Sequence, residues 1–373
     1  MHAAIVAAHI LGSSLAPDAK KYRLLADMLN DAAVILDTLS PRFDTLFFPG
    51  LRVAALCLSA SFRSLCAISA GGSKASISLH FATPLKGTGD VGDLNAKDAS
   101  KETVLALLGM LVRLYIDGNV LLVLFIFSKL GTLIVPHLTT PWTIYTTLIV
   151  LVGLHLTINY IGVRGLVLRT LNGQRTWIAW SAYMHTQPGR APLTPVEVAH
   201  LERIFERPGT FRDPKSGVIL GLCSIGSSFS EILGGPIPPR LLELFKDERY
   251  LLWFDRRCLF WSDSPSIQGS LRLHICLKDG YNTKDQLKAW ILAAELCRVI
   301  SARRSTSNVV DDALGILEET YGKVVELVPD FVEKMQALGW NTHDCALLSG
   351  SPVAVILSVE NSADEATERK KTR

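Results

Sequence analysis

One stretch of the chain, residues 142–163, contains no Asp, Glu, Lys or Arg. A helix needs about 20 predominantly apolar residues to cross the hydrocarbon core of a bilayer, and this stretch is long enough. Trp142 and Tyr145 stand at one end and Tyr160 near the other, where aromatic residues of membrane helices meet the headgroups. We therefore predict a transmembrane helix here. The alternative is the central helix of a soluble bundle, which is usually shorter.

Two other stretches are apolar enough to share a membrane with this one. Residues 103–135 contain three charged side chains, and the run 120–128 has none. Residues 51–72 carry Arg63 near their middle. A charge at the centre of a membrane helix costs about 2.5–3.5 kcal/mol on insertion scales. The segment is therefore either a marginal traverse or a helix buried among others.

The composition agrees with an apolar, mainly helical chain. Charged residues make up 20% and hydrophobic residues 49%, with a mean hydropathy of +0.28, whereas soluble domains carry about 25% charged residues. The apolar excess requires lipid or an unusually large core. We expect a mainly α fold, in which a membrane-embedded helical region is followed by a small soluble α+β C-terminal domain. The protein would be an integral membrane protein, in an organelle that the sequence does not identify.

Charge and cysteine content exclude several classes of function. The net charge is only +3, and no basic run is interleaved with aromatic residues, which argues against nucleic acid as a partner. The seven cysteines form no CxxC pair and have no histidine at ligand spacing, which argues against structural zinc and against a disulfide framework. No metal and no cofactor is expected.

The chain divides into four predicted parts. They are an N-terminal amphipathic helical region (1–50), a membrane-associated helical core (51–235), a soluble α+β domain (236–348) and a disordered tail (349–373). In the first part, apolar residues recur at helical spacing over 20–40, and Pro41 is expected to end that helix.

Several elements are expected after the apolar helices. Thr194 and Glu197 form a capping box that predicts a helix running to about Arg207. Residues 217–233 are interpreted as a packed helix or a re-entrant segment. Residues 249–255 and 271–277 predict strands, Thr283 with Gln286 predicts the start of a helix, and a last helix over 309–338 is expected to end at Gly339.

A polar connector, residues 73–102, lies inside the helical core. His80, Asp93, Lys97 and Asp98 are the residue types that a proton relay or an anion site requires, and ionisable groups at a membrane edge are often functional. The alternative is structural: Asp98 or Ser100 caps a helix that begins near Lys101, and Lys97 pairs locally with Asp93. Gly71 and Gly72 are expected to end the preceding helix.

Two further groups of polar residues are candidates for a ligand site. His155 and Asn159 are one helical turn apart in the charge-free stretch, and they could line a polar pathway or simply bond to a neighbouring helix. Arg164, Arg169 and Arg175, with Asn172, could hold an anionic headgroup or a phosphorylated small molecule. The same charges could serve only to set the orientation of the membrane helices.

Taken together, several blocks resemble the root UV-B sensitive (RUS) family of membrane-associated proteins. These blocks span about residues 23–348, and they are Phe62-Arg63-Ser64, residues 78–82, residues 93–98 with Ser100, Glu102 and Thr103, residues 107–109, Leu154-His155, Asn159-Tyr160, Val163-Arg164, residues 169–172 with Arg175, and Gly339-Trp340. The family pattern would pass almost directly from Leu111 to Gly131. Residues 112–130 are therefore predicted to be an insertion, either genuine or a product of the gene model.

The resemblance implies a membrane-embedded helical region and a soluble C-terminal part. Plant members of this family are linked to UV-B responses, vitamin B6 homeostasis and auxin transport, while the family's biochemical activity is undefined. We expect a non-enzymatic membrane protein, a transporter or a scaffold, whose partners are the bilayer and another RUS-family protein or a second copy of itself. The alternative is a membrane-interface enzyme, or a protein that binds a phosphorylated metabolite through the 73–102 connector.

Overall fold

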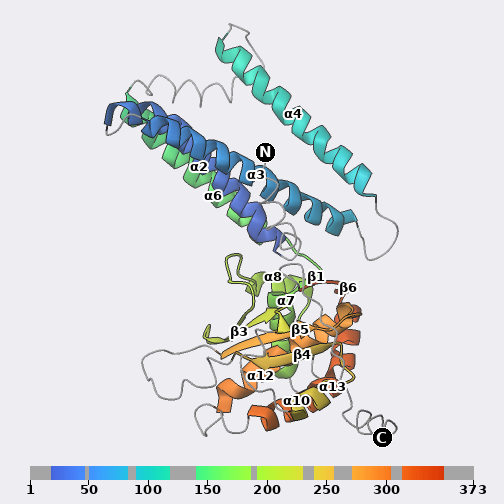
Figure 1. Cartoon of the computed structure of the whole chain (residues 1–373). Helices are drawn as coiled ribbons and strands as arrows, with labels where there is room; N and C mark the ends of the chain where they lie inside the picture. The colour runs from blue at the N-terminus through green and yellow to red at the C-terminus, as the bar shows by residue number, and fades with distance from the viewer. Residues whose placement is uncertain are drawn as a thin grey trace, which may run out of the picture. The chain divides into compact units, whose positions relative to one another are not determined.

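A computed structural model describes residues 18–46, 50–82, 90–117, 140–185, 191–229, 239–255, 271–303 and 313–347 (Figure 1). The chain forms two compact units, Met1–Arg169 and Thr170–Arg373. The first unit is helical in its described part, and the second surrounds a small sheet with helices. The expected mainly helical chain with a small α+β region toward the C-terminus is confirmed.

Four long helices make up the described part of the first unit. They are α2 (Ala19–Leu46), α3 (Leu51–Ala82), α4 (Val91–Asp117) and α6 (Pro141–Arg164). Helix α2 packs along both α3 and α6 (Figure 1). Among the described residues, α3 and α6 are the two helices long and apolar enough to cross a membrane.

Small residues hold α2 and α3 together. Ala26 and Ala33 of α2 are buried, as are Ala55, Ser59 and Ser69 of α3. The Ser59 hydroxyl donates to the Ala33 carbonyl at 3.2 Å. Small residues let two helix backbones approach closely and are typical of helix packing in membranes, where apolar burial itself gives no driving force.

The expectation that Pro41 ends the first helix is wrong, because α2 continues to Leu46. Proline has no N–H for the carbonyl four residues earlier, which here is that of Asp37. The Ser40 hydroxyl donates to this carbonyl at 2.9 Å. A side chain therefore replaces the missing backbone donor, and the helix passes the proline.

Residues 73–82 and 91–102 of the polar connector are helical, contrary to the sequence-based interpretation, and residues 83–89 lie outside the described residues. Helix α3 runs through Gly71 and Gly72 to Ala82, and the Ser73 and Ser76 hydroxyls donate to the Ser69 carbonyl at 2.7 Å and the Gly72 carbonyl at 3.1 Å. The two glycines adopt no positive φ, so they do not act as a C-cap.

Helix α4 starts earlier than expected. Its first turn is capped by Asp90, whose carboxylate accepts from the Gly92 N–H at 2.7 Å, and not by Asp98 or Ser100. Both of those residues lie inside the helix. Of the predicted insertion, residues 112–117 belong to α4, and residues 118–130 lie outside the described residues.

The second unit is built on a four-stranded sheet. The strand order is β2 (Thr210–Arg212), β3 (Ile219–Ile225), β5 (Leu271–Leu277), β4 (Tyr250–Phe254), with β3 and β5 parallel and the outer pairs antiparallel. A separate parallel pair joins β1 (Thr170–Asn172) to β6 (Asn341–Ala346). The other helices are α7 (Gly173–His185), α8 (Pro195–Leu201), α10 (Pro239–Leu244), α12 (Thr283–Arg303) and α13 (Ala313–Ala337).

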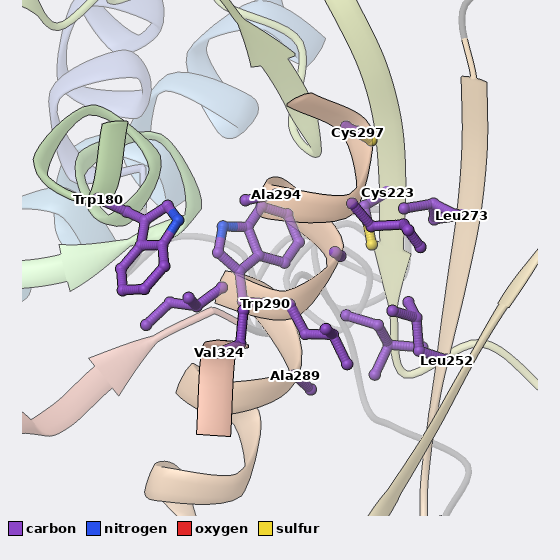
Figure 2. Packing of buried hydrophobic residues seen from close by; sticks show 14 of the residues in the cluster. Trp180, Cys223, Leu252, Leu273, Ala289, Trp290, Ala294, Cys297 and Val324 are labelled. Carbon is purple, nitrogen blue, oxygen red and sulfur yellow. The ribbon is translucent and has the colours of Figure 1, made fainter. Parts of the chain in front are cut away.

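Helix α12 covers one face of the sheet and forms the centre of the core. Figure 2 shows Cys223, Leu252 and Leu273 of the sheet beside Trp290 and Cys297 of this helix. All five are at most 5% exposed. The face that carries Cys223 and Leu273 is thus the inner face, and the residue on either side of each along its own strand points to the other face.

Several expectations for this unit are confirmed and others are corrected. The strands β4 and β5, the Thr194–Glu197 capping box and the end of α13 at Gly339, with φ +88°, are as predicted. Residues 219–225, interpreted as part of a packed helix or a re-entrant segment, form β3, because alternate residues of this segment pack on α12.

Two helix ends are also corrected. Helix α8 ends at Leu201 rather than near Arg207. The cap of α12 is Asn282 with Asp285, one position before the expected pair of Thr283 and Gln286. The Asn282 side chain accepts from the Lys284 N–H at 2.8 Å, and the Asp285 carboxylate accepts from the Asn282 N–H at 2.9 Å.

We predict that Glu206→Gln destabilises the second unit by about 1–2 kcal/mol at pH 7, the range of a charge-assisted hydrogen bond that is partly retained. Arg212 donates to both Glu206 oxygens, at 2.7 and 3.0 Å, and holds the pKa of this carboxyl below its usual 4.5. Such a group stabilises the fold above its unfolded pKa, and the stabilisation is lost as pH falls through the native pKa.

Urea unfolding of the full chain, followed by tryptophan fluorescence from pH 7 to pH 3, measures this effect. The difference between wild type and Glu206→Gln should shrink below about pH 4.5. The exposed Glu333, replaced by Gln, is the matched control. A difference that stays constant with pH would contradict the prediction.

Candidate functional site

Two buried carboxylates face the packed helices of the first unit. Asp27 and Asp31 are one turn apart on α2, and they are 9% and 6% exposed. Carboxylates are almost never this buried without a partner. Two buried carboxylates on the helix that packs against α3 and α6 are therefore a candidate functional feature.

His155 of α6 joins Asp31 in a chain of hydrogen bonds. Its Nδ1 lies 2.8 Å from Asp31 Oδ2, and its Nε2 lies 2.8 Å from the Asn159 amide nitrogen. An amide NH2 is only a donor, so Nε2 accepts and the ring proton is assigned to Nδ1, which donates to Asp31. Asn159, His155 and Asp31 thus form a directional relay between two helices.

Asp27, one turn before Asp31 on α2, is a second buried acceptor. Its Oδ1 lies 3.5 Å from an Arg23 guanidinium nitrogen, and its Oδ2 is buried with no hydrogen-bond partner among the described residues. An unpaired buried carboxylate oxygen is costly, and loss of hydration disfavours the charged form. The position is suited to take up a proton or to accept a hydrogen bond from a ligand. We call Asp27, Asp31, His155 and Asn159 the α2–α6 polar cluster.

The helices around the α2–α6 polar cluster present apolar side chains outward. Most residues of α6, and most of those in the apolar part of α3, are not buried. The exposed side chains include Val53, Leu56, Leu58, Leu79 and Phe81 on α3 and Ile149, Val150, Leu151, Leu154, Ile158 and Ile161 on α6. A large exposed apolar surface marks a site of contact with protein or membrane.

The connector residues form local pairs. Lys97 and Asp93 pair at 2.6 Å on the exposed side of α4, as the structural alternative predicted, and Asp98 lies 3.9 Å from Lys74 of α3. His80 is buried near the end of α3. Its backbone carbonyl accepts from Arg169 at 3.4 Å.

The three arginines lie in different surroundings. Arg164 is the exposed last residue of α6, while Arg169 reaches the end of α3. Arg175 is buried inside the second unit, where it pairs with Glu202 at 2.8 Å and donates to the Thr170 carbonyl. Asn172 caps α7 by accepting from the Arg175 N–H at 2.8 Å.

Sequence reasoning placed His155 and Asn159 together but missed both aspartates. Asp27 and Asp31 belong to the helix predicted over 20–40, whose charged side was expected to face away from the apolar side. The available signal was their i,i+4 spacing, which puts two like charges on one face of a helix. Nothing in the sequence linked them to a histidine 124 positions away.

Comparison with known proteins identifies the family of the domain that contains the α2–α6 polar cluster. A family model described as "Vitamin B6 photo-protection and homoeostasis domain" matches residues 1–187. The chain belongs to the root UVB sensitive (RUS) family. The matched RUS domain contains all of the first unit with β1 and α7, so it contains the whole cluster.

Individual relatives agree with the RUS assignment. The chain is 26% identical over 347 residues to the Arabidopsis thaliana "Protein root UVB sensitive 3", covering 89% of this chain and 64% of that protein. It is 30% identical over 201 residues to the Dictyostelium discoideum "RUS family member 1", covering 54% of this chain and 33% of that protein. It is also 25% identical over 334 residues to the Arabidopsis "Protein root UVB sensitive 2, chloroplastic", covering 89% of this chain and 64% of that protein. The chain thus spans less than two thirds of each of these RUS proteins. No solved structure matches it.

Proposed function

We propose that this RUS protein is an integral membrane protein that carries a protonatable vitamin B6 vitamer across the bilayer. The observation that carries the proposal is the α2–α6 polar cluster, a buried carboxylate pair joined to a histidine among helices with apolar outer faces. Ionisable groups in such surroundings are expensive, and they mark substrate or ion pathways.

The dimensions and charges of the helices support a place in the membrane. Helix α6 has 24 residues, which gives a length of about 36 Å against a hydrocarbon core of about 30 Å. The charge of Arg63 makes α3 a marginal membrane-crossing helix by its sequence. In the structure Arg63 forms an ion pair with Asp37 of α2. Arg164 and Arg169 follow the end of α6, and arginines just after a membrane helix favour the cytoplasmic side or its organellar equivalent.

The chemistry of the α2–α6 polar cluster suits a pyridine ring. In enzymes that hold a B6 cofactor, an aspartate is a common partner of the protonated ring nitrogen. Asp27 Oδ2, buried and without a partner among the described residues, is such an acceptor. Binding of the protonated ring would supply the missing donor and neutralise the carboxylate. The relay from Asn159 through His155 to Asp31 gives the second proton position that a proton-linked carrier requires.

Uptake of radiolabelled pyridoxal by proteoliposomes that contain the full chain tests this proposal. We expect uptake driven by an imposed pH gradient, and a loss of at least tenfold in Asp31→Asn, Asp27→Asn and His155→Gln. Asp93→Asn and His200→Gln change exposed residues outside the α2–α6 polar cluster and are the matched controls. Circular dichroism and thermal unfolding of each variant separate lost transport from lost folding.

Two results would count against the proposal. Equal uptake by wild type and the cluster variants would exclude the α2–α6 polar cluster as the site. Release of the protein from membranes by alkaline extraction would exclude membrane integration. Membrane retention without any uptake would favour the scaffold function, in which the apolar faces of α3 and α6 bind another RUS protein or a second copy of this chain.

A further inference from the structure

Polar residues of β3 and β5, and the aspartate that follows β4, gather on the outer face of the second unit's sheet. Ser224 of β3 pairs in register with His274 of β5, and His274 pairs in register with Trp253 of β4. Residues paired across strands share a face of the sheet, and so do residues two apart along a strand. Asp255, two residues after Trp253, is held beside β5 by its N–H, which donates to the Arg272 carbonyl at 2.8 Å.

Two serines and an aspartate surround the His274 ring. Its Nδ1 lies 2.8 Å from Ser224 Oγ and 3.0 Å from Ser227 Oγ, and the two hydroxyl oxygens are 2.7 Å apart. Its Nε2 lies 3.7 Å from Asp255 Oδ2. The imidazole therefore lies between two hydroxyls beside Nδ1 and a carboxylate beside Nε2. The histidine of a Ser-His-Asp triad lies between the same two kinds of group.

The proton positions follow from the chemistry of these groups. Asp255 Oδ2, at 3.7 Å, is beyond hydrogen-bond distance and acts on the ring through its negative charge, so we assign the ring proton to Nε2, which faces it, and leave Nδ1 as an acceptor. One hydroxyl then donates to Nδ1. With Ser224 in that role, the Ser227 hydroxyl donates to Ser224 Oγ. In serine proteases Nε2 faces the serine and Nδ1 faces the aspartate, and here the two nitrogens are exchanged. The ring still lies between a hydroxyl and a carboxylate.

Exposure distinguishes the two serines. Ser224 is exposed, whereas Ser227 is 8% exposed. Ser224 is therefore the serine that a molecule from solution can reach more easily. Two further residues lie on the same face. The half-buried indole of Trp253 supplies apolar surface beside His274. The exposed Arg272 lies diagonally across the sheet from Ser224, with the two backbones roughly 8 Å apart, and its long side chain can span that distance.

We propose that Ser224 is a nucleophile activated by His274, with Asp255 and Ser227 as positioning residues, and that it accepts acyl groups from small carboxylic esters. This activity goes beyond the transport function and belongs to the other unit of the chain. Ser224 Oγ bonds to the acyl carbon while its proton passes to His274 Nδ1. The ester C–O bond breaks, and the alcohol leaves with that proton. Water, giving a proton to His274, then attacks the acyl carbon and releases the carboxylic acid and free Ser224. Arg272 is the cation available to the developing oxyanion.

A tagged fluorophosphonate probe and hydrolysis of p-nitrophenyl acetate by the full chain test this activity. Attack of Ser224 Oγ on phosphorus expels fluoride and leaves a stable adduct, which peptide mass spectrometry of wild-type protein should locate on Ser224. This readout needs no variant. We expect Ser224→Ala to abolish labelling and His274→Gln to slow it at least 100-fold, the usual range of a general base.

The positioning residues are tested by conservative rescue. Asp255→Asn should slow labelling about tenfold with an unchanged thermal midpoint, and Asp255→Glu should restore part of the rate. Ser216→Ala and His343→Gln alter an exposed serine and an exposed histidine elsewhere in the unit and should have no effect. An adduct on other residues only, or labelling and hydrolysis that persist in folded Ser224→Ala, would overturn the proposal. No reaction of the wild type with either reagent would also overturn it.

Discussion

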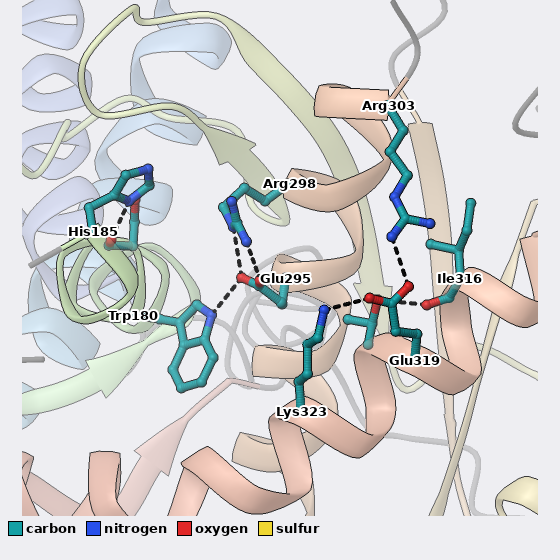
Figure 3. Close-up of polar contacts among 10 residues, drawn as sticks. Trp180, His185, Glu295, Arg298, Arg303, Ile316, Glu319 and Lys323 are labelled. Atoms are coloured by element: carbon teal, nitrogen blue, oxygen red, sulfur yellow. Dashed lines mark hydrogen bonds and ion pairs between the residues drawn. The ribbon is translucent and has the colours of Figure 1, made fainter. Parts of the chain in front are cut away.

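Replacing Arg298 with methionine is expected to lower the free energy of unfolding of the second unit by about 3 kcal/mol, the cost of leaving a buried charge without its partner. Glu295 of α12 is 2% exposed and accepts from the Arg298 guanidinium and from the Trp180 indole N–H, the latter at 3.1 Å (Figure 3). Methionine removes the only cation paired with Glu295 among the described residues.

Urea unfolding of the full chain measures this loss, and a double variant tests its cause. If the cost is an uncompensated carboxylate, Glu295→Met combined with Arg298→Met should recover most of the stability, since apolar replacement of a whole buried pair is often neutral. Lys323→Met breaks an exposed pair with Glu319 in the same unit and should have a much smaller effect (Figure 3). Equal losses in Arg298→Met and Lys323→Met would refute the argument.

Gly209→Ala is the second substitution with a large expected effect, at about 3 kcal/mol or more, because backbone strain and a steric clash add. Gly209 has a φ of +80°, and a Cβ at this position would lie 2.1 Å from the Cys223 carbonyl oxygen. That oxygen belongs to the central strand β3, whose Cys223 N–H bonds to the Gly209 carbonyl at 2.8 Å. Neither backbone can move without breaking the sheet.

Gly280→Ala separates the two contributions. Gly280 has a similar φ of +75°, but the nearest atom to its Cβ would be the end of the Arg249 side chain at 4.0 Å. This variant should therefore lose only the strain of the left-handed conformation, about 1–2 kcal/mol. Both are compared by thermal and urea unfolding. A loss in Gly280→Ala as large as that in Gly209→Ala would show that the clash with Cys223 contributes nothing.

Local patterns in the sequence predicted the local structure well. The Thr194–Glu197 capping box, the strand 271–277 and the glycine that ends α13 each depend on a few consecutive residues. The errors at Pro41 and at Gly71–Gly72 arose where a side chain at one position compensates for a residue that normally breaks a helix. The Ser40 hydroxyl bonds the carbonyl that Pro41 leaves without a donor, and the serines of α3 carry the helix past two glycines.

The candidate sites were less predictable than the elements that carry them. His155 and Asn159 are one turn apart, so their hydrogen bond follows from helical geometry. Their link to Asp31 depends on which face of α2 packs on α6, and helical periodicity alone does not determine this. The Ser224–His274 contact requires two strands 50 positions apart to be neighbours in the sheet. The sequence indicates a packed helix or a re-entrant segment for one of those strands, and neither of these predicts the contact.

The ion pair between Arg63 of α3 and Asp37 of α2 has a consequence for how the protein would enter a membrane. Alone, α3 would carry the unpaired charge of Arg63 and α2 that of Asp37, and an unpaired charge resists transfer into lipid. When they pair, the two charges neutralise each other. The buried alanines and serines of α2 and α3 bring the two helix backbones close together. In the proposed membrane protein, α3 would therefore enter the bilayer more easily with α2 beside it than alone.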